Sequence, residues 1–232
     1  MKKMFLIVTV SAVLSLTSVF AESGKIIQSL HLSVPIQTET WKSESSMISS
    51  RLADKKNNDI LFYGVNLNWN RMTLGEGGFS FLFGMGLGAT SAISDDFKGI
   101  DGNKGFNSDI KLGWGFAPLR SEKNILVFHG FFGFNFKYLT GSDTRTSDDC
   151  SADLDYTAEH FALALGIDAL FIHRFSDSFG LMAGLDVSTT LYGFSFFFID
   201  SSNQFVIENE SYSFDFFGKV NFVPRIGVCW IM

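Results

Sequence analysis

After its first 21 residues the chain has no apolar run long enough to cross a membrane as a helix. Such a helix needs about 20 apolar residues in a row, and polar residues interrupt every later stretch. Because lipid offers no partners to backbone groups, only helices and closed β-barrels span a bilayer. A membrane location for this chain would therefore require a barrel.

Basic patches are also missing. The formal net charge is -6, and no cluster of Lys and Arg alternates with aromatic residues. Proteins that bind nucleic acid normally carry a basic face, so nucleic acid is not expected as a partner.

Histidine and cysteine are scarce. The four histidines lie apart at His31, His129, His160 and His173. Metal sites need clustered ligands and nucleophilic enzymes need a His with Ser and Asp nearby, so we expect no metal, no cofactor and no enzymatic activity. His160, beside Glu159 and downstream of Asp153 and Asp155, is the one faint similarity to a lipid-modifying barrel enzyme, and no motif supports it.

Two residue types are abundant instead. The chain holds 27 Phe and 22 Gly but only 3 Pro, with 16% aromatic and 18% charged residues. This composition is typical of β-rich envelope proteins and unusual for a cytosolic enzyme.

The first residues have the features of a secretory signal peptide. Lys2 and Lys3 precede an apolar stretch at 5–16, and Val19-Phe20-Ala21 fits a cleavage site. We therefore expect residues 1–21 to be a signal peptide and 22–232 to form one barrel domain.

The rest of the chain alternates apolar and polar residues with a period of two, which is the period of a β-strand. The clearest case is 125–139, where Leu126, Phe128, Phe132, Phe134 and Phe136 share one face. Eight such strands are expected at about 26–36, 61–70, 79–90, 109–116, 125–139, 160–171, 179–191 and 219–232.

The connections alternate between long and short. Long ones are expected after the first, third, fifth and seventh strands, including an acidic loop at 140–157. The fourth long connection has apolar runs at 194–199 and 205–207. It is expected to form a protruding hairpin with a bulge at Phe197. A hairpin within the first long loop would make ten strands, an alternative that the pattern leaves open.

The volume of the barrel interior determines which face of the strands points outward. An eight-stranded barrel has an interior only just filled by side chains, so columns of Phe, Trp and Leu do not fit inside, whereas Gly, Ala, Ser and Asn do. The apolar columns also lack charges, as a lipid-facing surface requires. We therefore predict an all-β, eight-stranded, antiparallel, up-and-down transmembrane barrel and reject a lipocalin-like barrel. Long loops would be extracellular, and short turns and both termini periplasmic.

The pattern over Lys25–Met232 resembles the small eight-stranded outer-membrane barrels of the outer-membrane protein A, X and W type, and looks most like small barrels of spirochaetes. The C-terminal strand, with Ile226, Val228 and Trp230 in phase, is similar to the signal read by the barrel-assembly machinery. It departs from that signal by ending in Met232 where the family usually has Phe or Trp. The resemblance implies an outer-membrane location, with outer-membrane lipid and the assembly machinery as partners.

Two sets of residues are candidate functional sites. The inward phase of the strands holds Lys111, Asp168, Asp186 and Arg225 at similar depths, and these are expected to pair because an unpaired buried charge is costly. Phe62 and Phe217, inward near the outer end, together with Phe194 and Phe196 of the fourth loop, would line an apolar pocket open to the outside.

The functional expectation follows from these features. The leading hypothesis is a barrel with a structural or adhesive role whose loops meet an extracellular ligand or host molecule. The alternative is a narrow channel or carrier for small hydrophobic molecules.

Overall fold

A computed structural model describes residues 24–43, 58–94, 100–147, 150–201, 210–214 and 220–232. The expected signal peptide at 1–21 lies outside them. The described chain is a set of strands: β1 (Lys25–Ser33), β2 (Ile36–Ser43), β3 (Asn58–Leu74), β4 (Phe79–Ser94), β5 (Ile100–Arg120), β6 (Asn124–Ser147), β7 (Cys150–Arg174), β8 (Phe179–Ser201), β9 (Glu210–Phe214) and β10 (Val220–Ile231). Among these residues no helix is both long and apolar enough to cross a membrane.

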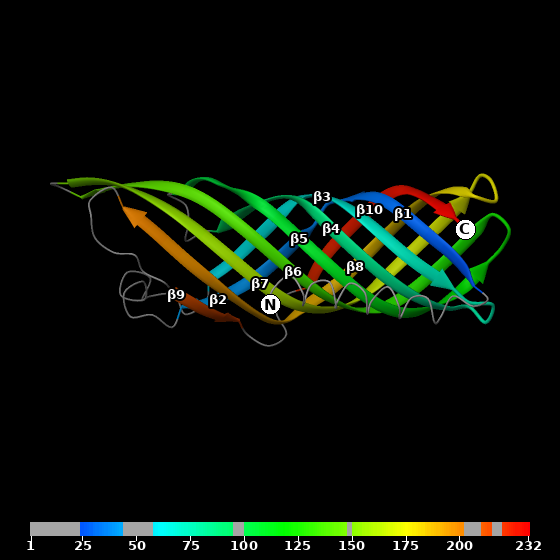
Figure 1. Ribbon diagram of the computed structural model, residues 1–232. Coiled ribbons are helices and arrows are strands. Elements are labelled where there is room, and N and C mark those ends of the chain that lie inside the picture. Colours follow the sequence, from blue (N-terminus) through cyan, green and yellow to red (C-terminus); the bar gives the residue numbers. More distant parts are fainter. Residues whose placement is uncertain (1–23, 44–57, 95–99, 148–149, 202–209, 215–219) are drawn as a thin grey trace, which may run out of the picture.

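The strands close into an antiparallel barrel with eight places in its wall (Figure 1). β1 and β2 share one place, since both pair with β3, and the break between them falls at Pro35, which has no N–H to donate. β9 and β10 share another, since both pair with β8. The predicted fold class and strand number are confirmed, and no hairpin of the first loop adds strands within the described ranges.

The first and last places meet to close the barrel. β1 pairs with β10 from Ile27 opposite Ile231 to Ser33 opposite Arg225. Beyond this ladder the Ile26 and Met232 backbones exchange two hydrogen bonds, of 3.0 and 2.8 Å. The C-terminal strand therefore holds the phase expected for it and seals the wall.

Three tight turns lie at one end of the barrel, at 75–78, 121–123 and 175–178. In the first, the Gly78 amide donates to the Gly75 carbonyl at 2.9 Å, and Gly78 has a φ of 87°, which favours glycine. We call this the short-turn end; it matches the three short connections expected from the sequence.

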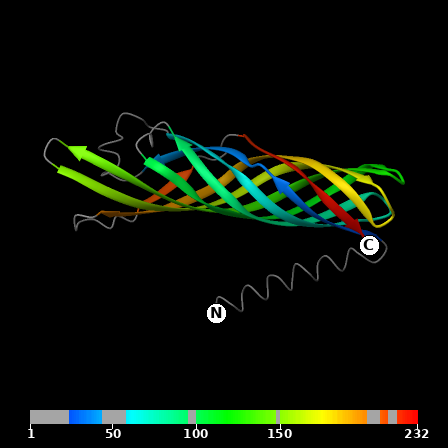
Figure 2. The same ribbon diagram turned by 90° about the horizontal axis from the view of Figure 1, so that it is seen from above.

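The opposite end, which we call the long-strand end, is built from strands longer than expected. β6 and β7 continue as a paired hairpin to Ser147 and Cys150, so the acidic segment 140–157 is mostly strand and not a loop. Likewise β8 continues to Ser201, and β9 pairs with it. Figures 1 and 2 show the β6–β7 hairpin projecting past the rest of the barrel.

The bulge also differs from the prediction. Leu163 pairs with Tyr192 and Ala164 with Thr190, so Leu191 is the inserted residue. Phe197 pairs in regular register with Ala158. Residues 202–209, including the apolar run at 205–207, lie outside the described part of the chain.

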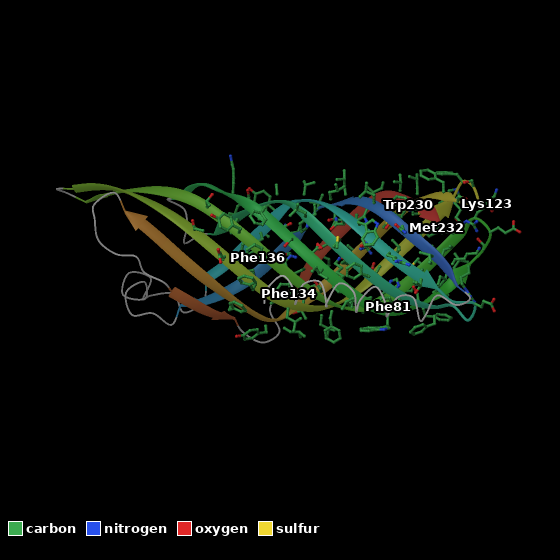
Figure 3. The ribbon with its side chains drawn as sticks, viewed as in Figure 1. Phe81, Lys123, Phe134, Phe136, Trp230 and Met232 are labelled. Atoms are coloured by element: carbon green, nitrogen blue, oxygen red, sulfur yellow. The ribbon has the colours of Figure 1, made fainter. Side chains whose placement is uncertain are left out.

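Large apolar side chains cover the outer surface of the wall (Figure 3). Leu67, Leu87, Phe132 and Ile167 are 49 to 62% exposed, although each lies in the middle of a strand. Toward the long-strand end, seven rings form a continuous chain of contacts: Phe106, Phe134, Phe136, Tyr138, Phe161, Tyr192 and Phe194. Such a surface is stable only when apolar groups cover it, as lipid does.

Candidate functional site in the lumen

The inward side chains form successive layers along the barrel axis. On β6, apolar Ile125 and Val127 lie nearest the short-turn end, followed by His129, then Phe131 and Asn135. β8 and β10 repeat this order, from Met182 to Asp186 to Ser188 and from Cys229 to Arg225 to Val223. The lumen therefore has an apolar layer, then an ionic layer, then a polar cavity.

The apolar layer is a compact core inside the barrel. Its members are each at most 8% exposed: Ile27, Met72, Leu74, Leu82, Ala117, Ile125, Val127, Leu170, Ile172, Met182, Cys229 and Ile231. The sequence analysis had expected mainly small and polar residues inside and missed this layer. Cys229 belongs to it, at the opposite end of the barrel from Cys150, which begins β7 beyond the long-strand end of the cavity.

The ionic layer brings together the four charged residues singled out from the sequence. Arg225 pairs with Asp168 and, at 3.2 Å from Nη2 to Oδ1, with Asp186. Lys111 pairs with the other carboxylate oxygen of Asp186. Asp168, Asp186 and Arg225 are at most 5% exposed, so the opposite charges compensate one another inside the barrel.

A histidine and a serine extend this layer, and the sequence analysis had not assigned them. The Ser80 hydroxyl lies 2.9 Å from His129 Nε2, and His129 Nδ1 lies 3.7 Å from Asp168 Oδ2. The order of groups matches that of a serine nucleophile with its base. However, Ser80 is 0% exposed and does not line the cavity, so the chain of contacts positions the ionic layer and offers no access to a substrate.

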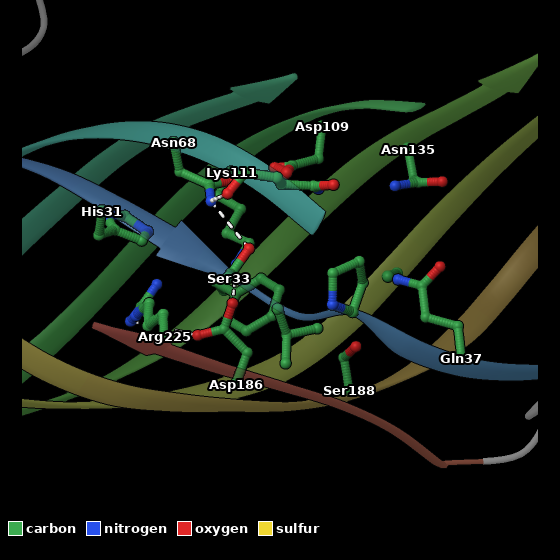
Figure 4. Close-up of a pocket in the computed structure, with 15 residues that line it drawn as sticks. His31, Ser33, Gln37, Asn68, Asp109, Lys111, Asn135, Asp186, Ser188 and Arg225 are labelled. Atoms are coloured by element: carbon green, nitrogen blue, oxygen red, sulfur yellow. Dashed lines mark hydrogen bonds and ion pairs between the residues drawn. The ribbon is translucent and has the colours of Figure 1, made fainter. Parts of the chain in front are cut away.

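A polar cavity of about 50 Å³ lies beyond the ionic layer (Figure 4). It is lined mainly by polar side chains: His31, Ser33, Gln37, Asn66, Asn68, Asp109, Lys111, Asn135, Asp186, Ser188 and Arg225, with Pro35, Phe131, Ala164 and Val223. One buried water needs roughly 10–15 Å³, so the cavity has room for a few water molecules or a small ion.

Asparagine and glycine residues shape one wall of this cavity. Asn66, Asn68 and Asn70 on β3 pair with Gly88, Gly86 and Gly84 on β4. A β-carbon at any of these glycines would collide with the side-chain oxygen of the opposite asparagine. The two alternating triplets flank the 75–78 turn in sequence, and that spacing is the signal by which this wall could have been recognised.

Of the four aromatic candidates, the structure describes the side chains of two, and these two lie on opposite faces of the wall. Phe62 points into the lumen, 1% exposed, with its ring centre 6.1 Å from that of His160 and 4.2 Å from Lys137 Nζ. Phe194 lies on the outer face, stacked on Phe161 at 5.0 Å. Phe217 and the side chain of Phe196 are outside the described part of the structure. His160, singled out above beside Glu159, is fully buried.

Comparison with known proteins shows a similarity of fold. No family model and no curated protein matches the sequence. The crystal structure of the outer membrane protein OprG from Pseudomonas aeruginosa matches with a TM-score of 0.54 and 10% identity, over 90% of this chain and 96% of that one. The chain therefore has the fold of a small outer-membrane β-barrel.

Other matches are weaker. A major outer membrane protein from Thermus thermophilus has a TM-score of 0.44 and 12% identity, over 88% of this chain and 99% of that one. The outer membrane protease OmpT from Escherichia coli has a TM-score of 0.45 and 8% identity, over 91% and 97%. Because one fold carries different functions, the function of this barrel has to be argued from its own lumen and strands.

Proposed function

We propose that this outer-membrane barrel is closed to solute flow and acts as a membrane-embedded platform. Its role is to present the long-strand end to an extracellular ligand or host molecule. The observation that carries the proposal is the filled lumen, in which the apolar layer and the ionic layer lie one above the other. Both layers consist of buried, contacting side chains.

The length of the strands supports the second half of the proposal. A transmembrane β-strand needs about 9–11 residues, whereas β6, β7 and β8 have 24, 25 and 23. At about 3.3 Å per residue, β6 measures roughly 80 Å along its length, against an apolar band about 25 Å tall. A strand tilted by about 45° crosses this band over roughly 35 Å of its length, so part of the β6–β7 hairpin extends beyond the lipid, where a partner can reach it.

Conductance tests the closed lumen directly. The refolded protein, checked by circular dichroism for β-structure, is inserted into a planar bilayer, with a general porin inserted in the same way as a positive control. We expect no discrete current steps. A variant that thins the apolar layer, Leu82→Ala with Met182→Ala, should show more current than the wild-type protein if this layer blocks the lumen.

Current steps in the wild-type protein would contradict the proposal. They would favour the alternative of a narrow channel or carrier for small hydrophobic molecules. Phe62, which faces the lumen, would then be the first residue to replace, by Asp, in a binding assay with an apolar probe.

The platform role has its own test. Refolded protein is compared with a variant shortened at the tip of the β6–β7 hairpin for binding to extracellular matrix or host-cell surfaces. Equal binding by the two proteins, or none by either, would count against presentation through this hairpin.

A further inference from the structure

We propose that the polar cavity in the lumen is a binding site for a monovalent metal cation of the Na⁺ or K⁺ class. The site would be formed by Asp109 and by the amide oxygens of Asn66, Asn68 and Asn135. The inference does not depend on whether the barrel conducts.

The first argument is that two acceptors face each other. A β-carbon at Gly86 would collide with Asn68 Oδ1 and with the carboxylate of Asp109, so these oxygens meet over one glycine. Neither group carries a proton to place between them, since an ionised carboxylate and an amide oxygen only accept. A positive group between the two oxygens would turn this repulsion into attraction.

The orientation of the Asn68 amide is fixed by its other contacts. Its Nδ2 donates to Ser33 Oγ at 2.8 Å and to the Asn66 backbone carbonyl at 3.3 Å (Figure 4). A backbone carbonyl accepts only, so turning the amide over would lose that bond. The oxygen of Asn68 therefore stays on the Asp109 side.

The second argument comes from buried oxygens that lack a partner. Asn66 is 4% exposed, lines the cavity, and its Oδ1 has no hydrogen bond among the described residues. Asn135 is half-buried and also lines the cavity, and its Oδ1 likewise has no hydrogen bond among the described residues; Asn135 pairs with Asp109 across β5 and β6. Leaving such groups unsatisfied costs free energy, and a ligand that offers positive charge to several oxygens at once would recover it.

The balance of charge agrees with a single positive charge. Around the ionic layer and the cavity, Asp109, Asp168 and Asp186 face the two cations Lys111 and Arg225. Among these five residues the acids outnumber the bases by one, and the ion pairs of Lys111 and Arg225 are made with Asp168 and Asp186.

The chemistry of the donors selects the class of cation. All four are oxygens, which hard cations prefer, and amide or carbonyl oxygens replace the water shell of Na⁺ and K⁺ in selective sites. A single carboxylate close to Lys111 does not supply the charge that a divalent ion normally requires.

Thermal unfolding in detergent micelles tests the site. The refolded chain is melted in NaCl, KCl and N-methylglucamine chloride at equal ionic strength, since this organic cation is too large for the cavity. Between about 1 and about 100 mM salt we expect the midpoint to rise by about 5 °C with Na⁺ or K⁺ and to stay level with the organic cation. Equal midpoints in all three salts would overturn the proposal.

Variants assign the effect to the site. Asp109→Asn keeps the shape of the side chain and removes its charge, so the difference between salts should disappear. Ser188→Ala, which changes the cavity lining outside the four oxygen donors, should keep that difference. An undiminished response in Asp109→Asn would contradict the assignment.

A spectroscopic measurement covers the case in which Asp109→Asn does not refold. The ²³Na resonance should broaden in the presence of wild-type protein and sharpen again when K⁺ is added, and Asn135→Ala should reduce the broadening. Absence of broadening in the wild-type protein at all Na⁺ concentrations would reject Na⁺ as the occupant.

Discussion

Arg225 on β10 and Asp168 on β7 form a buried ion pair although their strands are not neighbours in the sheet. β8 separates the two strands and contributes Asp186, which also contacts Arg225, at 3.2 Å. The contacts of Arg225 with Asp168 and Asp186 therefore connect β7, β8 and β10 through the lumen. Such a contact fixes the shape of the barrel in cross-section, which hydrogen bonds between adjacent strands do not do alone.

Replacing Arg225 tests how much this contact contributes to the free energy of unfolding. Arg225→Ala leaves Asp168 without its main partner and Asp186 with Lys111 alone, and removing one member of a buried pair typically costs about 3–5 kcal/mol. We expect the variant to unfold at lower denaturant concentration, followed by tryptophan fluorescence in detergent. Lys123→Ala, an exposed charge in the 121–123 turn, should change the free energy of unfolding by less than about 0.5 kcal/mol. An unchanged midpoint for Arg225→Ala would refute a stabilising network.

The glycine row on β4 yields a second prediction. Gly86→Ala places a methyl group where Asn68 and Asp109 already lie, and overpacking of this kind costs about 1–3 kcal/mol. Gly130→Ala is the matched control, because a β-carbon there meets nothing within 4 Å, and alanine should be neutral or slightly stabilising. Gly86→Ala should therefore lower the denaturant midpoint, whereas Gly130→Ala should leave it unchanged or raise it slightly, and equal shifts would contradict the packing described for this wall.

The sequence was sufficient to predict the membrane-facing half of the barrel. There one face of each strand meets lipid and the other meets the lumen, so the alternation is strong, as in Phe128, Phe132 and Phe134. The strand extensions at 140–157 were taken for a loop for the opposite reason. In that segment the period of two disappears from the sequence although the pairing of the strands continues.

The lumen was predictable in phase but not in detail. Alternation places Lys111 and Arg225 inside, yet which acid each one meets depends on how the closed barrel staggers its strands. The apolar layer was not predicted, because near the short-turn end both faces of the strands are apolar. In β6, for example, Ile125 and Val127 on the inner face alternate with Leu126 and Phe128 on the outer face. The bulge was misplaced because three consecutive phenylalanines at 196–198 obscure the phase, whereas the inserted residue is Leu191.

The last prediction concerns the lipid-facing surface. It separates the effect of a residue's exposure from the effect of its depth in the bilayer. Ile167 and Phe175 are equally exposed, at 62 and 61%, but Ile167 lies within β7 and Phe175 in the turn that follows it. An arginine near the bilayer midplane costs about 2–4 kcal/mol, against about 0–1 kcal/mol near the interface. Ile167→Arg should therefore lower the stability of the barrel in lipid vesicles much more than Phe175→Arg, measured by urea unfolding. If the two substitutions cost the same, the middle of β7 does not lie in the hydrocarbon region, and the position of the apolar band along the barrel axis would have to be revised.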